Sequence, residues 1–363
     1  MSEATFQEGS VFGQVMKSEH EQVVFCYDKA SGLKALIAVH NTVLGPAAGG
    51  TRMWMYKNEA DALNDVLRLS RGMTLKNSVA GINLGGGKAV IIGNSRTDKS
   101  EALFRSFGKY VNSLSGKYIT AEDVGIGPAD MEYVSMETDY VSGLPESMGG
   151  GGDPSPVTAY GVYLGMKASA KKAYGSDSLA GKKISVQGVG HVGAYLVEQL
   201  TKENAEVFIA DINEDNLKQV SKKFGATVVG KDEIYDLDVD IYAPCALGAT
   251  VNDDTLGRLK CDIIAGAANN QLKDENIHAD ACKQKNIIYA PDFLINSGGI
   301  INVYYEIIKN YNRDRAFAHT EKIYDTTAEL LKKADEENIN THEAAIRIAL
   351  KRIEDVGRLK RTF

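Results

Sequence analysis

The sequence predicts an α/β protein of two domains. Its 363 residues exceed what a single hydrophobic core usually serves. Short apolar runs rich in Val and Ile alternate with helical patterns, as in sheets covered by helices. The strongest break in composition is GGGGDPSP at 149–156, which is typical of a linker or hinge. We therefore expect an N-terminal α/β substrate domain over 1–148 and a second domain over 149–324, with a cleft between them. A helical tail over about 325–363 is expected to pack back on the first domain.

The composition excludes several classes of function. A hydrophobic content of 44%, a charged content of 25% and a net charge of -7 argue against a nucleic-acid-binding surface. The first ten residues are acidic and polar, unlike a secretory signal, and no apolar run approaches the ~20 residues that span a membrane. The four cysteines and six histidines form no metal-binding pattern. We expect a cytoplasmic protein without a metal, a nucleic-acid partner or a membrane anchor.

The first domain should begin with a hairpin whose strands cover 23–27 and 33–40. The following segment, GPAAGGTR at 45–52, is dense in glycine and alanine, which marks close approach of the backbone by either a ligand or another strand. Asn58 is then placed to cap a helix that leads into Met73.

Two lysines lie among small and apolar residues in GMTLKNSVAGINLGGGKAVIIG, the segment 72–93. Lys88 opens the apolar run 89–92, which reads as a buried strand. Burial disfavours the charged form of an amine, and a second lysine, Lys76, would add to this effect, so Lys88 is a candidate base. The glycines at 85–87 would let a small substrate lie close to the backbone. The alternative is two ordinary lysines, one at a helix end and one extending from a strand.

An acid follows the next predicted strand. After a helix over about 100–115, the strand 118–121 ends in Glu122, Asp123 and then glycine. The ends of strands are where α/β sheets bind ligands. A solvated turn or helix cap is the alternative for this stretch.

The second domain carries a dinucleotide-binding signature. The strand 183–187 leads into GVGHVG, which places Gly188, Gly190 and Gly193 before a helix, and the next strand ends in Asp211. The glycines permit a tight turn and close approach of a pyrophosphate to the helix N-terminus, and the acid binds ribose hydroxyls. Because Asp211 would repel a 2'-phosphate, we expect NAD rather than NADP. The alternative is a structural glycine turn.

Further α/β units follow. Short strands at 240–243 and 262–265 run into loops at 244–248 and 266–270, and the amides of Asn269 and Asn270 suit a carboxamide or an amino acid, or simply a turn. The tail is expected to be two charged helices that make a contact with the first domain or with another subunit.

Eight segments together give the chain a resemblance. They are GPAAGGTRMW, GMTLKNSVAGINLGGGKAVIIG, YITAEDVG, GDPSPVTAYGV, QGVGHVG, APCALGA, AGAANNQL and INSGGIINV. In this order they resemble the amino acid dehydrogenases specific for glutamate, leucine, phenylalanine and valine. The resemblance implies NAD-dependent oxidative deamination of an L-amino acid by a homo-oligomer with a Rossmann-type second domain.

The resemblance also implies roles for individual residues. Lys76 would bind the substrate carboxylate, Lys88 would activate the attacking water, and Asp123 would carry the proton to and from nitrogen. The other implied substrate-binding residues are Gly49, Met73, Ala48, Ala121, Asn270, Ile300 and Val303. The implied cofactor-binding residues are Gly188, Gly190, Val192, Gly193, Asp211, Thr158, Ala246 and Asn269.

The substrate expected first is a branched-chain amino acid, with leucine ahead of valine and isoleucine. Ala48 stands where the family often has Leu or Met and widens the pocket, while Ile300 in place of valine narrows it. Phenylalanine or another aromatic amino acid is the alternative. A 2-hydroxy acid dehydrogenase would need a histidine base that no motif provides. A non-catalytic NAD-binding homologue is the remaining alternative, although Lys76, Lys88 and Asp123 are all present.

Overall fold

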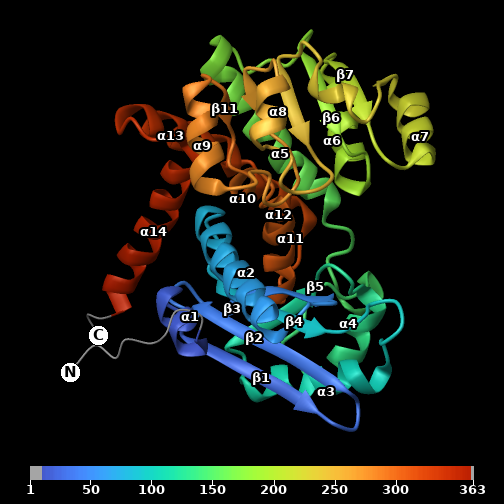
Figure 1. Ribbon diagram of the computed structural model, residues 1–363, viewed down its shortest axis with the longest axis vertical. Coiled ribbons are helices and arrows are strands. Elements are labelled where there is room, and N and C mark those ends of the chain that lie inside the picture. Colours follow the sequence, from blue (N-terminus) through green and yellow to red (C-terminus); the bar gives the residue numbers. More distant parts are fainter. Residues whose placement is uncertain (1–9, 361–363) are drawn as a thin grey trace. The chain divides into compact units, whose positions relative to one another are not determined.

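The computed structural model of the protein describes residues 10–360. The chain forms two compact units, each built around one sheet (Figure 1). The first comprises Met1–Gly152, Val303–Asn310 and Leu350–Phe363, and the second comprises Asp153–Asn302 and Tyr311–Ala349. The chain thus first passes between units inside the glycine- and proline-rich segment. No helix among residues 10–360 has the length and apolar character that a membrane crossing requires.

The first unit contains a five-stranded mixed sheet in the order β1-β2-β4-β3-β5. Its strands are β1 (Gln22–Asp28), β2 (Leu33–Asn41), β3 (Ala47–Trp54), β4 (Gly85–Ile92) and β5 (Tyr118–Glu122). The predicted hairpin is confirmed, since β1 and β2 pair antiparallel. β4 pairs antiparallel with β2 and parallel with β3, which is also parallel to β5. The central strand β4 includes the three glycines that precede Lys88.

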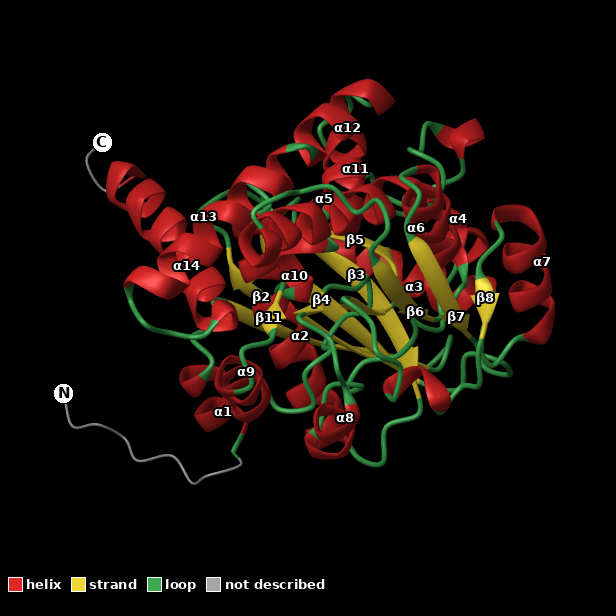
Figure 2. Ribbon diagram, turned by 90° about the horizontal axis from the view of Figure 1, so that it is seen from above, coloured by secondary structure: helices red, strands yellow, loops and turns green. Residues whose placement is uncertain are grey.

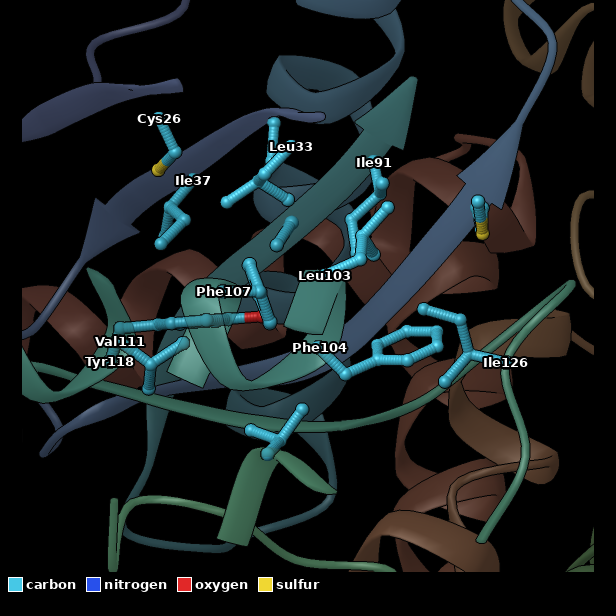
Figure 3. Close-up of a cluster of buried hydrophobic side chains, with 14 of the residues drawn as sticks. Cys26, Leu33, Ile37, Ile91, Leu103, Phe104, Phe107, Val111, Tyr118 and Ile126 are labelled. Carbon is cyan, nitrogen blue, oxygen red and sulfur yellow. The ribbon is translucent and has the colours of Figure 1, made fainter. Parts of the chain in front are cut away.

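Helices cover both faces of this sheet. They are α1 (Val11–Lys17), α2 (Glu59–Val79), α3 (Glu101–Ser113), α4 (Pro128–Ser135) and the short 3-10 helix η1 (Glu146–Met148). The predicted N-cap is confirmed, because the Asn58 side chain accepts a hydrogen bond from the Asp61 amide at 2.9 Å. On one face, Leu63 and Val66 of α2 pack in a core with Val90 of β4. On the other, Phe104 and Phe107 of α3 pack against residues of β2 and β4 such as Ile37 and Ile91, as Figure 3 shows.

The alternation of side chains along β4 determines on which face of the sheet Lys88 lies. Successive side chains of a strand point to opposite faces. Ala89 and Ile91 belong to the core that contains α3, and Val90 belongs to the core that contains α2. Lys88 therefore lies on the α2 face of β4.

The second unit contains a six-stranded parallel sheet in the order β11-β10-β9-β6-β7-β8. Figure 2 shows the short strand β8 beside β7. Its strands are β6 (Lys183–Gln187), β7 (Glu206–Ala210), β8 (Thr227–Val228), β9 (Ile241–Pro244), β10 (Ile263–Ile264) and β11 (Ile288–Tyr289). Counted along the chain, this is the 3-2-1-4-5-6 order of a dinucleotide-binding fold. The predicted α/β class with a Rossmann-type domain is confirmed. Strand β8 was not predicted from the sequence; it is a two-residue exposed strand at the edge of this sheet.

The remaining helices complete both units. They are α5 (Ser155–Tyr174), α6 (His191–Lys202), α7 (Glu214–Phe224), η2 (Glu233–Tyr235), α8 (Asp253–Arg258), α9 (Glu275–Gln284), α10 (Asp292–Ile295), α11 (Gly298–Ile307), α12 (Arg313–Thr320), α13 (Lys322–Glu336) and α14 (Thr341–Lys360). The tail differs from the expectation. Helix α13 packs on α5 in the second unit, and only Leu350–Phe363 group with the first. There Arg352 of α14 donates hydrogen bonds to the carbonyls of Ser78, in the last turn of α2, and of Ile82, just past its end.

Candidate active site

An ion pair between a buried lysine and a half-buried aspartate lies in the first unit. The Lys88 Nζ is 2.9 Å from Oδ2 of Asp123, and Lys88 is 6% exposed. β4 supplies the lysine, and the aspartate directly follows β5. The two candidate catalytic residues, 35 positions apart by number, are thereby brought into direct contact.

Asp123 has a second cationic partner, Arg52 of β3. The Arg52 Nε lies 3.2 Å from the same Oδ2 atom. Burial favours the neutral acid, but the charge and hydrogen bond of Lys88 and the charge of Arg52 outweigh it, so the pKa of Asp123 is lowered. Asp123 is therefore held as a carboxylate.

The surroundings of Lys88 differ from the expectation in two respects. Burial and a second lysine were expected around Lys88, whereas its closest charged partner is the carboxylate of Asp123. Arg52 was not among the predicted residues, although an arginine inside the apolar strand GTRMW carries the same signal as Lys88, which is a charge in an otherwise buried element.

The glycines at 85–87 also have a different role from the one expected. A β-carbon on Gly85 would lie 2.0 Å from the Asn41 carbonyl oxygen, and one on Gly86 would lie 2.0 Å from Oγ1 of Thr74. On Gly87 it would lie 2.7 Å from the Tyr118 ring. Neighbouring protein atoms therefore occupy the space that a side chain would take, and the glycines allow β4 to pack closely rather than leaving an approach for a substrate.

Several predicted substrate-binding residues gather around the same strands. A β-carbon on Gly49 would lie 3.1 Å from Cγ of Met73, and one on the adjacent Gly50 would lie 3.0 Å from Cβ of Asp123. Gly50 also pairs with Ala121. Ala48 is enclosed, with 1% of its surface exposed. Lys76 is half-buried in the last turn of α2, one helical turn from Met73.

The other predicted substrate-binding residues lie on α11 and in a loop. Ile300 and Val303 are three positions apart on α11, and both are half-buried. Asn270 follows β10 and has a positive φ of 53°, which suits an asparagine in a turn. Ile300 and Asn270 belong to the second compact unit, and Val303 belongs to the first.

The glycine turn of the second unit has the form that a dinucleotide requires. Gly188 has φ +98°, and a β-carbon there would lie 2.6 Å from Cβ of Ala246. One on Gly193 would lie 2.0 Å from the Gly188 carbonyl oxygen, so turn and helix are in close contact. A β-carbon on Gly190 would meet no atom within 4 Å, so the space beside it is open to a ligand. Helix α6 begins next, without a side-chain cap on its first amides, which suits a pyrophosphate.

Asp211 follows β7 and faces this turn. Its Oδ2 accepts a hydrogen bond from the Val189 amide at 2.7 Å, and its Oδ1 accepts one from Asn213 at 2.8 Å. Asp211, at the end of β7, is thereby held beside the glycine turn. In dinucleotide-binding folds, an acid at this position binds the ribose hydroxyls.

Two further predicted cofactor residues are oriented by neighbours. Thr158 lies on α5, where its hydroxyl donates to the Pro154 carbonyl at 3.0 Å and faces Gly299, whose β-carbon would lie 2.7 Å from Oγ1. Oδ1 of Asn269 accepts a hydrogen bond from Nδ2 of Asn296 at 2.8 Å. Asn296, 3% exposed, was not among the predicted residues, although it lies in INSGGIINV. Val192, also predicted, is half-buried in the first turn of α6.

Together the parallel sheet with its glycine turn and the lysine–aspartate pair are the parts of a dehydrogenase that uses a nicotinamide dinucleotide. Family models agree with this class and narrow it. Residues 20–140 match the Glu/Leu/Phe/Val dehydrogenase dimerisation domain, and residues 149–213 and 208–360 match Glutamate/Leucine/Phenylalanine/Valine dehydrogenase. The chain belongs to this family of amino acid dehydrogenases, which confirms the resemblance found in the sequence.

Individual relatives cover nearly the whole chain. Leucine dehydrogenase of Bacillus cereus is 53% identical over 353 residues, covering 97% of this chain and 96% of the relative. Phenylalanine dehydrogenase of Lysinibacillus sphaericus is 47% identical over 342 residues, covering 93% and 89%. The crystal structure of L-tryptophan dehydrogenase from Nostoc punctiforme superposes with a TM-score of 0.86 at 46% identity, covering 96% of this chain and 99% of that one.

Proposed function

We propose that the protein catalyses the reversible, NAD-dependent oxidative deamination of a branched-chain L-amino acid, with leucine as the main substrate and valine and isoleucine also accepted. The observation that carries this proposal is the Lys88–Asp123 ion pair, in a chain 53% identical to a leucine dehydrogenase. The amino acid, NAD⁺ and water give the 2-oxo acid, ammonium, NADH and a proton.

In this proposal, each of the three charged residues has a distinct role in the reaction. Lys76 binds the α-carboxylate as a point charge. Asp123, held as a carboxylate, accepts a proton from the substrate ammonium group. Lys88 activates the water that adds to the imino carbon and stabilises the carbinolamine, and Asp123 returns a proton to the departing nitrogen. The nicotinamide, when bound, supplies the two-electron acceptor.

The side-chain pocket is proposed from residues of the site. Gly49, Met73, Ala121, Ile300 and Val303 line it in this proposal, together with Ala48. Asn270 contacts the substrate. An aromatic amino acid remains the second candidate, because relatives 47% identical act on phenylalanine and tryptophan and Ala48 leaves room for a larger side chain.

The dinucleotide is NAD in this proposal because Asp211 places a carboxylate at the ribose position. Gly188, Gly190, Val192, Gly193 and Ala246 hold the pyrophosphate region, and Thr158 and Asn269 hold the nicotinamide. Changing Asp211 to Ser should raise the ratio of activity with NADP to activity with NAD at least about 10-fold, a differential binding energy of about 1.4 kcal/mol. An unchanged ratio would remove Asp211 from the ribose site.

The protein is further proposed to act as a homo-oligomer. The family model for its first domain is described as a dimerisation domain. The edge strand β1 exposes Phe25 and Tyr27, at 58% and 62%, and an exposed apolar edge strand is suited to pairing with another chain.

The test is NADH formation at alkaline pH with leucine, isoleucine, valine, methionine, phenylalanine, tryptophan and glutamate. We expect kcat/KM to be highest for the branched-chain substrates. Preference for phenylalanine or tryptophan would contradict the substrate assignment and leave the reaction intact. No turnover with any amino acid, in a protein that binds NADH, would instead favour a non-catalytic homologue.

A further inference from the structure

Arg52 joins two acids of the first unit. Its Nε contacts Oδ2 of Asp123 at 3.2 Å, and its NH1 contacts Oδ2 of Asp65 at 3.0 Å. Its side chain is 22% exposed. Burial acts against the guanidinium charge, yet the two carboxylates raise the pKa of Arg52 above its usual value. A planar guanidinium can hold two acids on different edges in a fixed geometry.

Asp65, the second acid, is itself held in place. The Tyr56 hydroxyl donates to Oδ2 of Asp65 at 2.7 Å, and the Arg68 NH2 group lies 3.1 Å from Oδ1. Asp65 lies on α2. A continuous chain of contacts therefore runs from α2 through Arg52 on β3 to Asp123 and on to Lys88 on β4.

The need for this chain follows from the work assigned to Lys88. In the resting site, Asp123 has Lys88 and Arg52 on one oxygen. When Lys88 turns to a water molecule, its bond to Asp123 weakens, and Arg52 is the cation that remains attached to the carboxylate. Without Arg52, the aspartate would lose a charge that favours its ionised form and a contact that fixes its torsion.

We propose that Arg52 is a positioning residue for the reaction: anchored by Asp65, it holds the carboxylate of Asp123 in place while Lys88 engages the reacting groups. This inference rests on the proposed function, since it requires Asp123 to transfer protons. Charged or titratable groups that face Asp123 include Lys88 from β4, Arg52 from β3 and, at longer range, the hydroxyls of Tyr118 and Tyr56.

The site of Arg52 is accessible to small ions. An open hollow of about 560 Å³ borders the network, and its lining includes Arg52, Asp65, Arg68 and the exposed Trp54. A guanidinium ion in solution can therefore reach the space that a truncated Arg52 would leave.

The test compares Arg52→Ala with wild type in the full-length protein. We expect kcat with the best amino acid of the panel to fall at least about 10-fold, with KM for that amino acid within about 3-fold, because Arg52 acts on Asp123 and not on the substrate. The acid limb of the pH profile should move to higher pH. Millimolar guanidinium should restore part of kcat, whereas urea at the same concentration should not.

Arg105→Gln is the matched control. Arg105 pairs with Glu101 and Glu137, is 44% exposed and is not part of the network described; its loss should change kcat less than about 2-fold. Asp65→Asn should also lower kcat, by a smaller factor than Arg52→Ala. If Arg52→Ala does not fold, Asp65→Asn tests the positioning role in its place.

The outcomes separate two failures. A wild-type protein that turns over no amino acid overturns the proposed function. If the wild type is active and Arg52→Ala keeps the wild-type kcat and pH profile, the positioning role alone is overturned. If Arg52→Ala does not fold, the same result with Asp65→Asn overturns it. A fall in kcat that guanidinium and urea relieve equally also overturns it, since the effect would then not depend on a cation beside Asp123.

Discussion

Two glycine-rich segments of the chain differ in how their glycines are packed. In β4, β-carbons on Gly85 and Gly86 would each lie 2.0 Å from protein atoms. In the turn before α6, β-carbons on Gly188 and Gly193 would also meet protein atoms, but one on Gly190 would meet nothing within 4 Å. The protein itself fills the space beside Gly85 and Gly86, whereas the space beside Gly190, at the start of a helix, is open.

The difference teaches that a glycine run beside a functional residue does not by itself indicate ligand approach. At Gly86, glycine is required so that α2 can pack against the sheet that carries Lys88. At Gly190, it keeps the turn open to an anion. Gly86 is therefore expected to serve stability and Gly190 to serve binding, and substitutions can separate these roles.

The largest effect is expected for Gly86→Ala. Its new β-carbon would lie 2.0 Å from Oγ1 and 2.2 Å from the backbone nitrogen of Thr74. Because backbone atoms of α2 cannot move aside locally, we expect the free energy of unfolding to fall by at least about 3 kcal/mol. Urea denaturation followed by circular dichroism measures this.

Two variants sharpen the result for Gly86. Thr74→Ala added to Gly86→Ala should not restore stability, since the backbone contact stays. Gly72→Ala, at an exposed position of α2 with no atom within 4 Å of the new carbon, should leave stability unchanged or raise it by up to about 1 kcal/mol. Wild-type stability in Gly86→Ala would show that Gly86 is not packed as described.

Gly190→Ala should affect the binding of NADH and not the stability of the protein. We expect a melting temperature close to that of wild type and a Kd for NADH raised at least about 10-fold, because the added methyl group enters the space for the pyrophosphate. Fluorescence titration with NADH provides the measurement. Unaltered affinity in the folded variant would mean that the dinucleotide does not pass Gly190.

A smaller effect is expected from a half-buried histidine that contacts Thr74, the neighbour of Gly86. Nδ1 of His40 lies 2.7 Å from Oγ1 of Thr74. Burial, followed by the charges of His20 and Arg71, lowers the pKa of His40 from its usual value of 6.5 to about 4. Between these two values the unfolded chain binds the proton and the folded protein does not. The free energy of unfolding should therefore fall as pH decreases from 6.5 to 4, by up to about 1.4 kcal/mol per pH unit.

Urea denaturation between pH 7 and pH 4 measures this slope. It should be shallower in His40→Gln and unchanged in His191→Gln, whose side chain is 87% exposed. The same slope in wild type and in His40→Gln would assign the pH dependence to other groups.

Much of the fold could be predicted because local patterns carry it. The strand 183–187, its glycine turn and Asp211 are a contiguous signal, and the hairpin follows from two apolar runs around a turn. The edge strand β8 could not be predicted, since two exposed residues have no periodicity. The position of α13 depends on its partner α5, and an amphipathic pattern shows that a helix has an apolar face but not what covers it.

The sequence supplied candidate residues for the site but not the contacts between them. Lys88 and Asp123 each stood out as a charge at the edge of an apolar strand. Their contact depends on the register of β3, β4 and β5, which no single motif encodes. The contacts of Arg52 and Asn296 could not be predicted for the same reason, because their partners are distant in sequence.

The central claim is that Lys88 and Asp123 carry out an amino acid deamination. The most direct test is leucine-dependent NADH formation by Lys88→Ala, measured beside NADH affinity in the same preparation. The account predicts that kcat falls by at least about 10²-fold while Kd for NADH stays within about 2-fold of wild type. Substantial turnover in the folded variant would contradict the assignment of Lys88 and the mechanism built on its pairing with Asp123.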